Sequence, residues 1–83
     1  MIQSIDPNPS SGSSSVTYFA PESGKTYIAV LNILGQTVYQ TEVRPGQDIS
    51  TAGLDLQNLS SGTYYCKLSQ NGRASFKILV VSK

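Results

Sequence analysis

Two alternating segments meet at an Asn-Gly pair in "TYYCKLSQNGRASFKILVV" (residues 63–81). In the first segment, Tyr64, Cys66 and Leu68 share one side of a period-2 pattern, which predicts a β-strand with these residues facing inward. Asn71-Gly72 follows, and this pair favours a type I′ turn because both of its central residues need positive φ angles. The stretch therefore predicts a hairpin of residues 63–69 and 73–83.

The second strand of this hairpin is apolar on both of its faces. The two faces hold Phe76, Ile78 and Val80 on one side, and Lys77, Leu79 and Val81 on the other. We expect the face with Phe76 to close the core. Lys77 and Val81 of the other face, with Lys83 and the terminal carboxylate, would then remain available to a receptor.

Four further segments have strand-like patterns and are bounded by turn residues. Residues 16–20 alternate cleanly, with Val16, Tyr18 and Ala20 on one face, and residues 25–34 are apolar on both faces, as in a central strand. Gly35-Gln36 then predicts a reversal into residues 37–43. Residues 47–62 are less regular, and their leucines are expected to be inward anchors (Leu54, Leu56 and Leu59).

No segment shows the period of an amphipathic helix, and turn signals recur every eight to twelve residues. This spacing predicts an all-β fold, an immunoglobulin-like β-sandwich of about seven short antiparallel strands with Greek-key connections. The chain of 83 residues has room for one domain. We assign residues 1–12 to a residual linker or first edge segment and residues 13–83 to the sandwich.

Composition limits the function classes. The net charge of +1 gives no field that points to nucleic acid, and no apolar run approaches the ~20 residues of a membrane span. The chain has no histidine, and its five acids are scattered without calcium-loop spacing. We therefore expect no enzyme activity, no metal and no cofactor. The charges are nonetheless segregated, since residues 62–83 carry four basic side chains and no acid.

Two features allow a functional and a structural interpretation. Cys66, the single cysteine, is expected to be a small buried hydrophobe rather than a reactive thiol. Tyr27, Tyr39 and Tyr65 are candidates for an exposed aromatic row that binds sugar or protein, although cross-strand pairing explains them more simply.

Four pieces of the sequence together resemble the type A C-terminal sorting domain of the type IX secretion system. They are "DPNPSSGSSSVTYFAPESG", "VLNILGQTVY", "LDLQNLSSGTYYCKLSQNG" and the terminal "FKILVVSK". The resemblance runs from about Asp6 to Lys83 and rests on the order and spacing of these pieces.

The resemblance implies a seven-stranded immunoglobulin-like domain that acts as an address. Its N-terminal cargo would cross the periplasm, and the domain would lead it through the outer-membrane translocon to the cell surface or medium of a Gram-negative bacterium. A surface sortase would then typically remove the domain. The implied partners are the translocon and shuttle proteins, the sortase and the cargo.

Carried over position by position, the resemblance places translocon recognition on the final strand, at Lys77, Val80, Val81 and Lys83. An edge strand has free backbone groups that add to a partner's sheet, and its lysines are suited to charged groups on a receptor. The structural motif residues are Pro7, Asn8, Pro9, Gly35, Gly62 and Tyr64.

Two alternatives remain at this stage. The first is a generic immunoglobulin-like interaction module, like that of flagellar hook-capping proteins, and the second is a carbohydrate-binding sandwich that uses its tyrosines. The final strand is also expected to allow a dimer by pairing between two copies.

Overall fold

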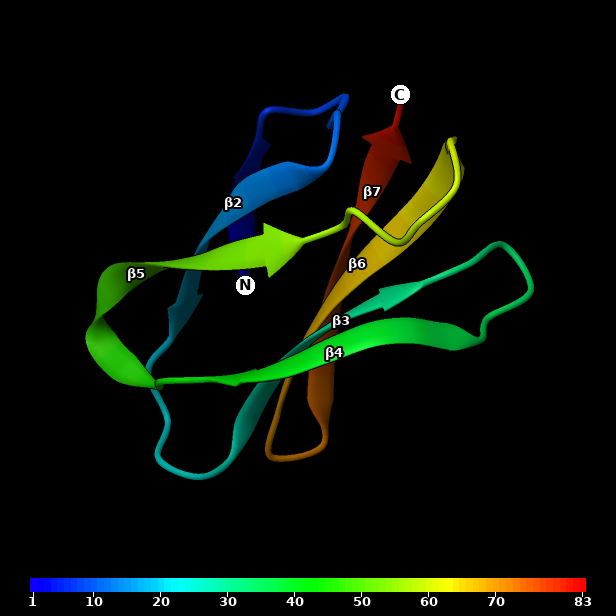
Figure 1. Ribbon diagram of the computed structural model, residues 1–83. Helices are drawn as coiled ribbons and strands as arrows, with labels where there is room; N and C mark the ends of the chain where they lie inside the picture. Colours follow the sequence, from blue (N-terminus) through cyan, green and yellow to red (C-terminus); the bar gives the residue numbers. More distant parts are fainter.

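Seven antiparallel strands form two facing sheets in the computed structural model, which describes residues 1–83 (Figure 1). The strands are β1 (Ile2–Asp6), β2 (Ser13–Ala20), β3 (Thr26–Leu31), β4 (Thr37–Val43), β5 (Gly46–Asp55), β6 (Gly62–Gln70) and β7 (Arg73–Val81). No helix is present. The predicted all-β fold with about seven antiparallel strands is confirmed, and the two-layer arrangement is consistent with an immunoglobulin-like sandwich.

The smaller sheet has the strand order β1-β2-β5, and the larger has the order β4-β3-β6-β7. The β3–β4 and β6–β7 hairpins lie within the larger sheet, whereas the chain changes sheet between β2 and β3, β4 and β5, and β5 and β6. As a result β7 is an edge strand of the larger sheet, and its nearest element in the other layer is β1, with which it makes contact.

The β6–β7 hairpin has the turn that its Asn-Gly pair predicts. Asn71 and Gly72 have φ angles of 53° and 78°, and Gln70 pairs directly with Arg73. Asn71 is the only non-glycine residue with a positive φ. A two-residue turn fixes the register of the whole hairpin, because it leaves no freedom in which residues lie opposite each other.

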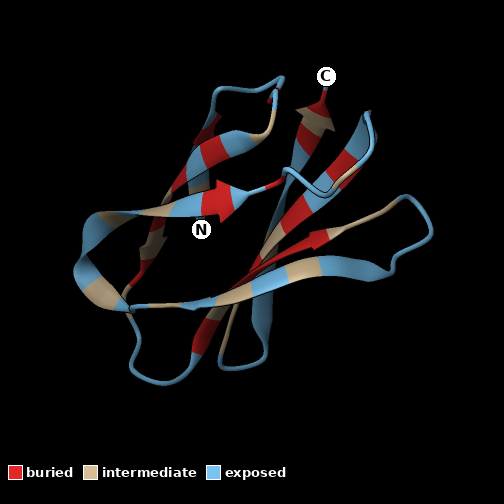
Figure 2. Cartoon of the chain, viewed as in Figure 1, coloured by how far each residue is buried: buried red, intermediate tan, exposed pale blue.

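A cluster of thirteen buried residues lies between the sheets. Its members are Ile5, Val16, Tyr18, Ala20, Ile28, Val30, Leu54, Leu56, Tyr64, Cys66, Leu68, Leu79 and Val81. The inward faces predicted for residues 16–20 and for β6 are thus confirmed. Figure 2 shows buried residues alternating with more exposed ones along the strands, while the hairpin ends are exposed.

Strand β3 is central, between β4 and β6, as its two apolar faces predict. Ile28 and Val30 are completely buried, and Ala29, on the opposite face, is also buried. Among the predicted leucine anchors, Leu54 and Leu56 are buried and Leu59 packs against the core while partly exposed. Residues 46–55, which looked irregular, form one continuous strand.

The first residues of the chain belong to the smaller sheet. Ile2–Asp6 form β1, which pairs with β2 along its length, and Ile5 contributes to the core. The β1–β2 connection then crosses to the edge of the larger sheet, where a parallel bridge joins Ser10 to Val81. This connection brings the start of the chain to the strand for which recognition is predicted.

Candidate recognition site on strand β7

The faces of β7 are the reverse of those predicted from the sequence. Leu79 and Val81 are buried, with 0% and 1% exposure, whereas Phe76 and Ile78 are 58% and 57% exposed. The hairpin register explains the reversal: Leu79 lies opposite Tyr64, and directly paired residues share a face of the sheet. The prediction that Phe76, Ile78 and Val80 close the core is therefore wrong.

The four predicted recognition residues do not form one surface. Lys77 is exposed and belongs to the inward side of β7, opposite Cys66, while the partly buried Val80 belongs to the outward side. Val81 is part of the core. Its side chain is therefore inaccessible to a receptor in the folded domain.

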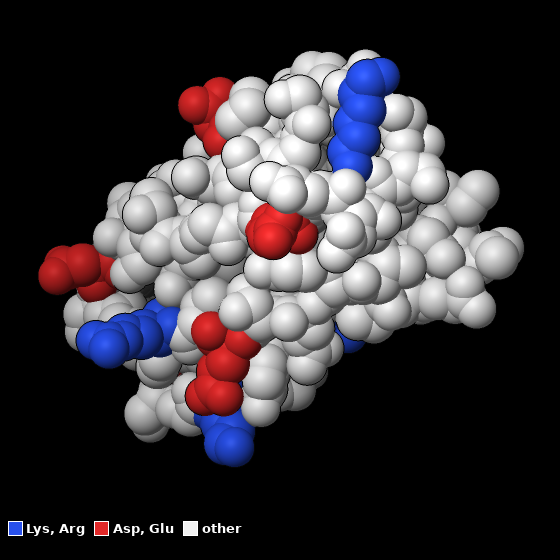
Figure 3. All heavy atoms as spheres, in the orientation of Figure 1, with Lys and Arg blue, Asp and Glu red and all other residues white.

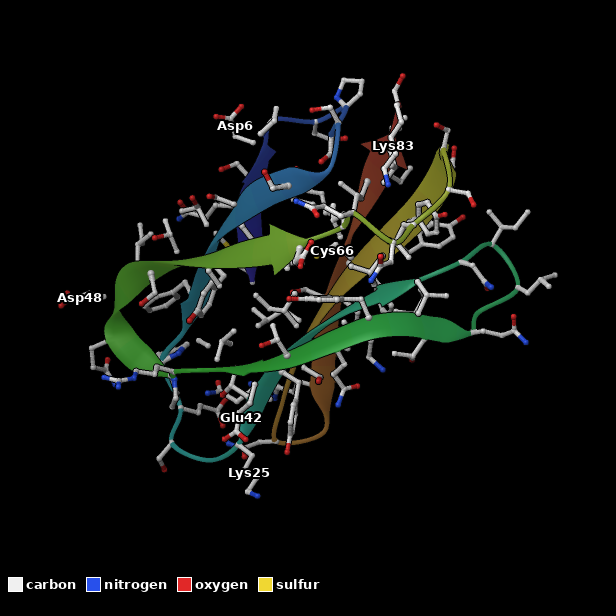
Figure 4. All side chains as sticks on the ribbon, in the orientation of Figure 1. Asp6, Lys25, Glu42, Asp48, Cys66 and Lys83 are labelled. Atoms are coloured by element: carbon white, nitrogen blue, oxygen red, sulfur yellow. The ribbon has the colours of Figure 1, made fainter.

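Lys83 lies beyond β7 and contacts the β5–β6 connection (Figure 4). Its backbone N–H donates a hydrogen bond to the Ser61 hydroxyl at 3.0 Å, and its Nζ donates to the Gln57 carbonyl oxygen. These contacts hold the exposed end of the chain against the sandwich.

The C-terminal half of β7 is covered by the β1–β2 connection. The Asn8 side chain donates to the Ile78 carbonyl oxygen at 2.9 Å and accepts from the Val80 N–H at 2.9 Å. The Ser10 N–H donates to the Val80 carbonyl oxygen at 2.7 Å, and the Ser10 carbonyl oxygen accepts from the Ser82 N–H at 2.8 Å. We call residues 8–10 the clasp.

The Asn8 carboxamide occupies the place of a peptide group in a neighbouring strand, since one side chain supplies both a donor and an acceptor to the edge. The clasp therefore satisfies the free backbone groups of β7 from the Ile78 carbonyl to the Ser82 N–H. Edge strands with such groups exposed are templates for added strands. Only the N-terminal half of β7 keeps free backbone groups on the side that faces away from β6.

The sequence matches the family described as "Secretion system C-terminal sorting domain" over residues 4–82. The chain belongs to this family. The match covers both the clasp and β7, and it confirms the resemblance to the sorting domain of type IX secretion. No curated protein matches the chain.

The proline-rich motif of this sorting domain, Pro7-Asn8-Pro9, overlaps the clasp and supplies its Asn8 and Pro9. The peptide bonds before Pro7 and Pro9 are both cis, and the Ser14 hydroxyl donates a hydrogen bond to the Pro7 carbonyl at 2.6 Å. Sequence reasoning assigned Pro7, Asn8 and Pro9 a structural role as turn formers. It did not foresee the contact of Asn8 with β7, because the bonded residues are 70 and 72 positions apart.

The other motif residues of the sorting domain lie in turns or next to the core. Gly35 has a φ of 83° in the β3–β4 turn, and Gly62 is the first residue of β6. Tyr64 is buried, and its hydroxyl donates to the Ser60 carbonyl at 2.7 Å. This bond satisfies the one polar group that the ring brings into the core.

Charged side chains are spread over the surface of the sorting domain, and Figure 3 shows no continuous patch of one sign on the viewed face. The single ion pair joins Arg73 to Glu22 at 3.3 Å, with the Arg73 side chain largely exposed and the Glu22 side chain about half exposed. An exposed pair of this kind stabilises a fold by about 1 kcal/mol or less. Lys77 has neither an ion pair nor a side-chain hydrogen bond.

The Cys66 side chain lies in the core between the two sheets (Figure 4). Burial disfavours the thiolate and raises the pKa of the thiol from 9.0 to about 11. The expectation of a buried, structural cysteine is confirmed, because thiolate is the nucleophilic form and it is scarce at neutral pH.

The candidate aromatic row of Tyr27, Tyr39 and Tyr65, for which cross-strand pairing was the simpler explanation, does not form. Tyr39 pairs with the inward-facing Val30 and packs against the core, whereas Tyr65 is exposed on the outer face of the larger sheet. A platform that needs Tyr39 beside Tyr65 is therefore absent. No group of acidic or cysteine side chains is arranged to hold a metal ion, and no helix is available to cross a membrane.

Proposed function

We propose that this sorting domain is a non-catalytic signal that directs an N-terminal cargo through the type IX outer-membrane translocon. The family match over residues 4–82 carries this proposal. Under it, the cargo passes through the periplasm and reaches the cell surface or medium of a Gram-negative bacterium. A surface sortase then removes the domain.

The exposed groups along β7 support a role for this strand in recognition by the translocon or its shuttle proteins. Lys77 is free of partners, Val80 is partly exposed on the opposite side, and Lys83 lies just past the strand. Val81 contributes indirectly, because its buried side chain keeps the end of β7 in the sandwich. Charged groups on a receptor steer binding through exposed lysines of this kind.

Export of a reporter tests the proposal. A fluorescent protein with a periplasmic targeting signal, fused before the domain in a type IX host, should appear at the surface or in the medium. Retention of this reporter in the periplasm would contradict the sorting function.

A second arm of the same assay tests the recognition residues. The double variant Lys77→Ala/Lys83→Ala should reduce export, while Arg44→Ala should not, since Arg44 is equally a surface cation but follows β4 at the opposite edge of the larger sheet. Arg44→Ala should show the unfolding midpoint of the parent domain. The double variant should lose about 1 kcal/mol or less of stability, because it removes only the hydrogen bond from Lys83 Nζ to the Gln57 carbonyl. Equal export of both variants would remove the two lysines from the recognition site.

A further inference from the structure

The backbone groups at the start of β7 have no neighbouring strand. The clasp bonds show that the backbone of Ile78 and Val80 faces away from β6. Backbone groups alternate in direction along an antiparallel strand, so the N–H and C=O groups of Ala74 and Phe76, and the N–H of Ile78, face the same way. These groups form an open edge that ends where the clasp begins.

A cavity of about 220 Å³ adjoins this open edge on the inward side of β7. Its lining includes Phe19 and Leu68 from the sandwich and Ala74 and Ser75 from the edge itself. A strand added along β7 would direct the side chain beside Ser75 toward this cavity, because successive side chains point to opposite faces of a sheet.

The outward side of the open edge is apolar. Phe76 and Ile78 are both more than half exposed, and they lie opposite Lys67 and Tyr65 of β6. Two adjacent large hydrophobic side chains at a strand edge give an added strand apolar contacts on this side. The core does not cover these two side chains, because Leu79 and Val81 on the opposite face of β7 are the ones that are buried.

The open edge carries positive charge, which favours an extended partner segment with acidic side chains. Lys77 follows Ser75 on the inward side and has no acidic partner. No acid occurs in residues 62–83, whereas Arg73, Lys77 and Lys83 lie on or beside β7. An acidic side chain placed next to Lys77 by strand pairing would give the lysine the ion pair that the domain itself does not supply.

We propose that Ala74–Ile78 form a docking edge for an extended segment of a partner protein. This segment carries apolar side chains beside Phe76 and Ile78 and an Asp or Glu beside Lys77. That the partner is a component of the export machinery rests on the proposed function. The pairing itself is a property of the edge and is tested without that machinery.

A second copy of the domain fits this edge less well. Antiparallel pairing of two β7 strands would bring Arg73 and Lys77 of one copy toward the same cations of the other, and like charges opposite each other destabilise a sheet. The docking edge therefore favours a different, acidic partner.

Two capped peptides serve as probes: four Val-Glu repeats and four Val-Lys repeats. Titrated into the isotope-labelled domain, the Val-Glu peptide should shift the amide signals of Ala74, Phe76 and Ile78 and slow their hydrogen exchange, whereas Val80 should change little. The Val-Lys peptide should bind more weakly. Lys77→Glu should weaken Val-Glu binding about two- to fivefold and reverse the preference, while Arg44→Glu should leave it unchanged.

Phe76→Ala tests the apolar contact separately. It should weaken the binding of both peptides, because it removes a side chain that the added strand contacts. The fold should stay intact, since the Phe76 side chain is mostly exposed. Absence of binding, binding at another edge, or self-association through β7 without peptide would overturn the inference. Export by the parent domain combined with full export by Lys77→Glu would contradict the docking edge alone. Failure of the parent domain to export would contradict the proposed function instead.

Discussion

The side-chain oxygen of Asn8 accepts a hydrogen bond of 2.9 Å from the backbone N–H of Val80, seventy-two positions away in the chain. The same side chain donates to the carbonyl of Ile78. One amide thus closes the edge of a strand that would otherwise expose a longer row of free backbone groups. Natural sheets protect their edges in several ways, and here the protection comes from the connection between β1 and β2.

The clasp should contribute measurably to stability. Asn8→Ala removes two hydrogen bonds to the backbone, and we expect the free energy of unfolding to fall by about 2 kcal/mol, at about 1 kcal/mol for each bond. Asn58→Ala is the matched control, because Asn58 is exposed and its side chain makes no hydrogen bond. Urea unfolding measures both. Equal midpoints for the two variants would show that the Asn8 bonds add nothing to stability.

The reversed faces of β7 give a sharp comparison of two truncations. Leu79→Ala removes a fully buried side chain and should lower the free energy of unfolding by about 2–5 kcal/mol. Phe76→Ala removes a larger side chain that is mostly exposed, and its effect should stay within about 1 kcal/mol. Urea titration of both variants decides between the two orientations of the strand. A larger loss for Phe76→Ala would support the faces first predicted from the sequence.

The sequence contains enough information to predict which face of β7 points inward, once the β6–β7 hairpin and its two-residue turn are assumed. An Asn71-Gly72 turn of two residues places Gln70 opposite Arg73, and counting outward then places Tyr64 opposite Leu79. The inward assignment of Tyr64 would have fixed that of Leu79. Periodicity alone does not decide, because both faces of β7 are apolar and the pattern fits either orientation.

Two other features were beyond sequence reasoning for physical reasons. The β3–β4 turn spans residues 32–36 and is longer than the predicted Gly35-Gln36 reversal. The Asn32 side chain supports this longer turn by accepting hydrogen bonds from the N–H groups of Leu34 and Gln36. A two-residue count therefore did not fix the register that turns Tyr39 inward. The contact of Asn8 with β7 depends on how two sheets stack. Local patterns predicted strands β2 to β7 and most of the core, but not this tertiary contact.

Cys66 should make stability depend on pH in the alkaline range. The pKa of its thiol is 9.0 when unfolded and about 11 in the core, so the folded state holds the proton more tightly. The contribution of the protonated thiol to the free energy of unfolding is fully present below pH 9 and is lost as the pH rises toward 11. The loss is at most about 3 kcal/mol.

The variant Cys66→Ala isolates this effect, because lysines and tyrosines titrate in both proteins. The difference in unfolding free energy between parent and variant should shrink from pH 9 to pH 11. Parallel pH curves would show that the thiol does not titrate differently in the folded and unfolded states.

Opening the clasp should lengthen the docking edge. In Asn8→Ala, the Val80 N–H loses its acceptor, and its hydrogen exchange should become faster relative to that of Leu79, whose backbone faces β6. The Val-Glu peptide should then shift the Val80 amide signal as well as those of Ala74 and Phe76. Its affinity should rise, since an added strand gains further backbone bonds. Unchanged affinity, with Val80 still unaffected by peptide, would show that the clasp does not limit the length of the edge.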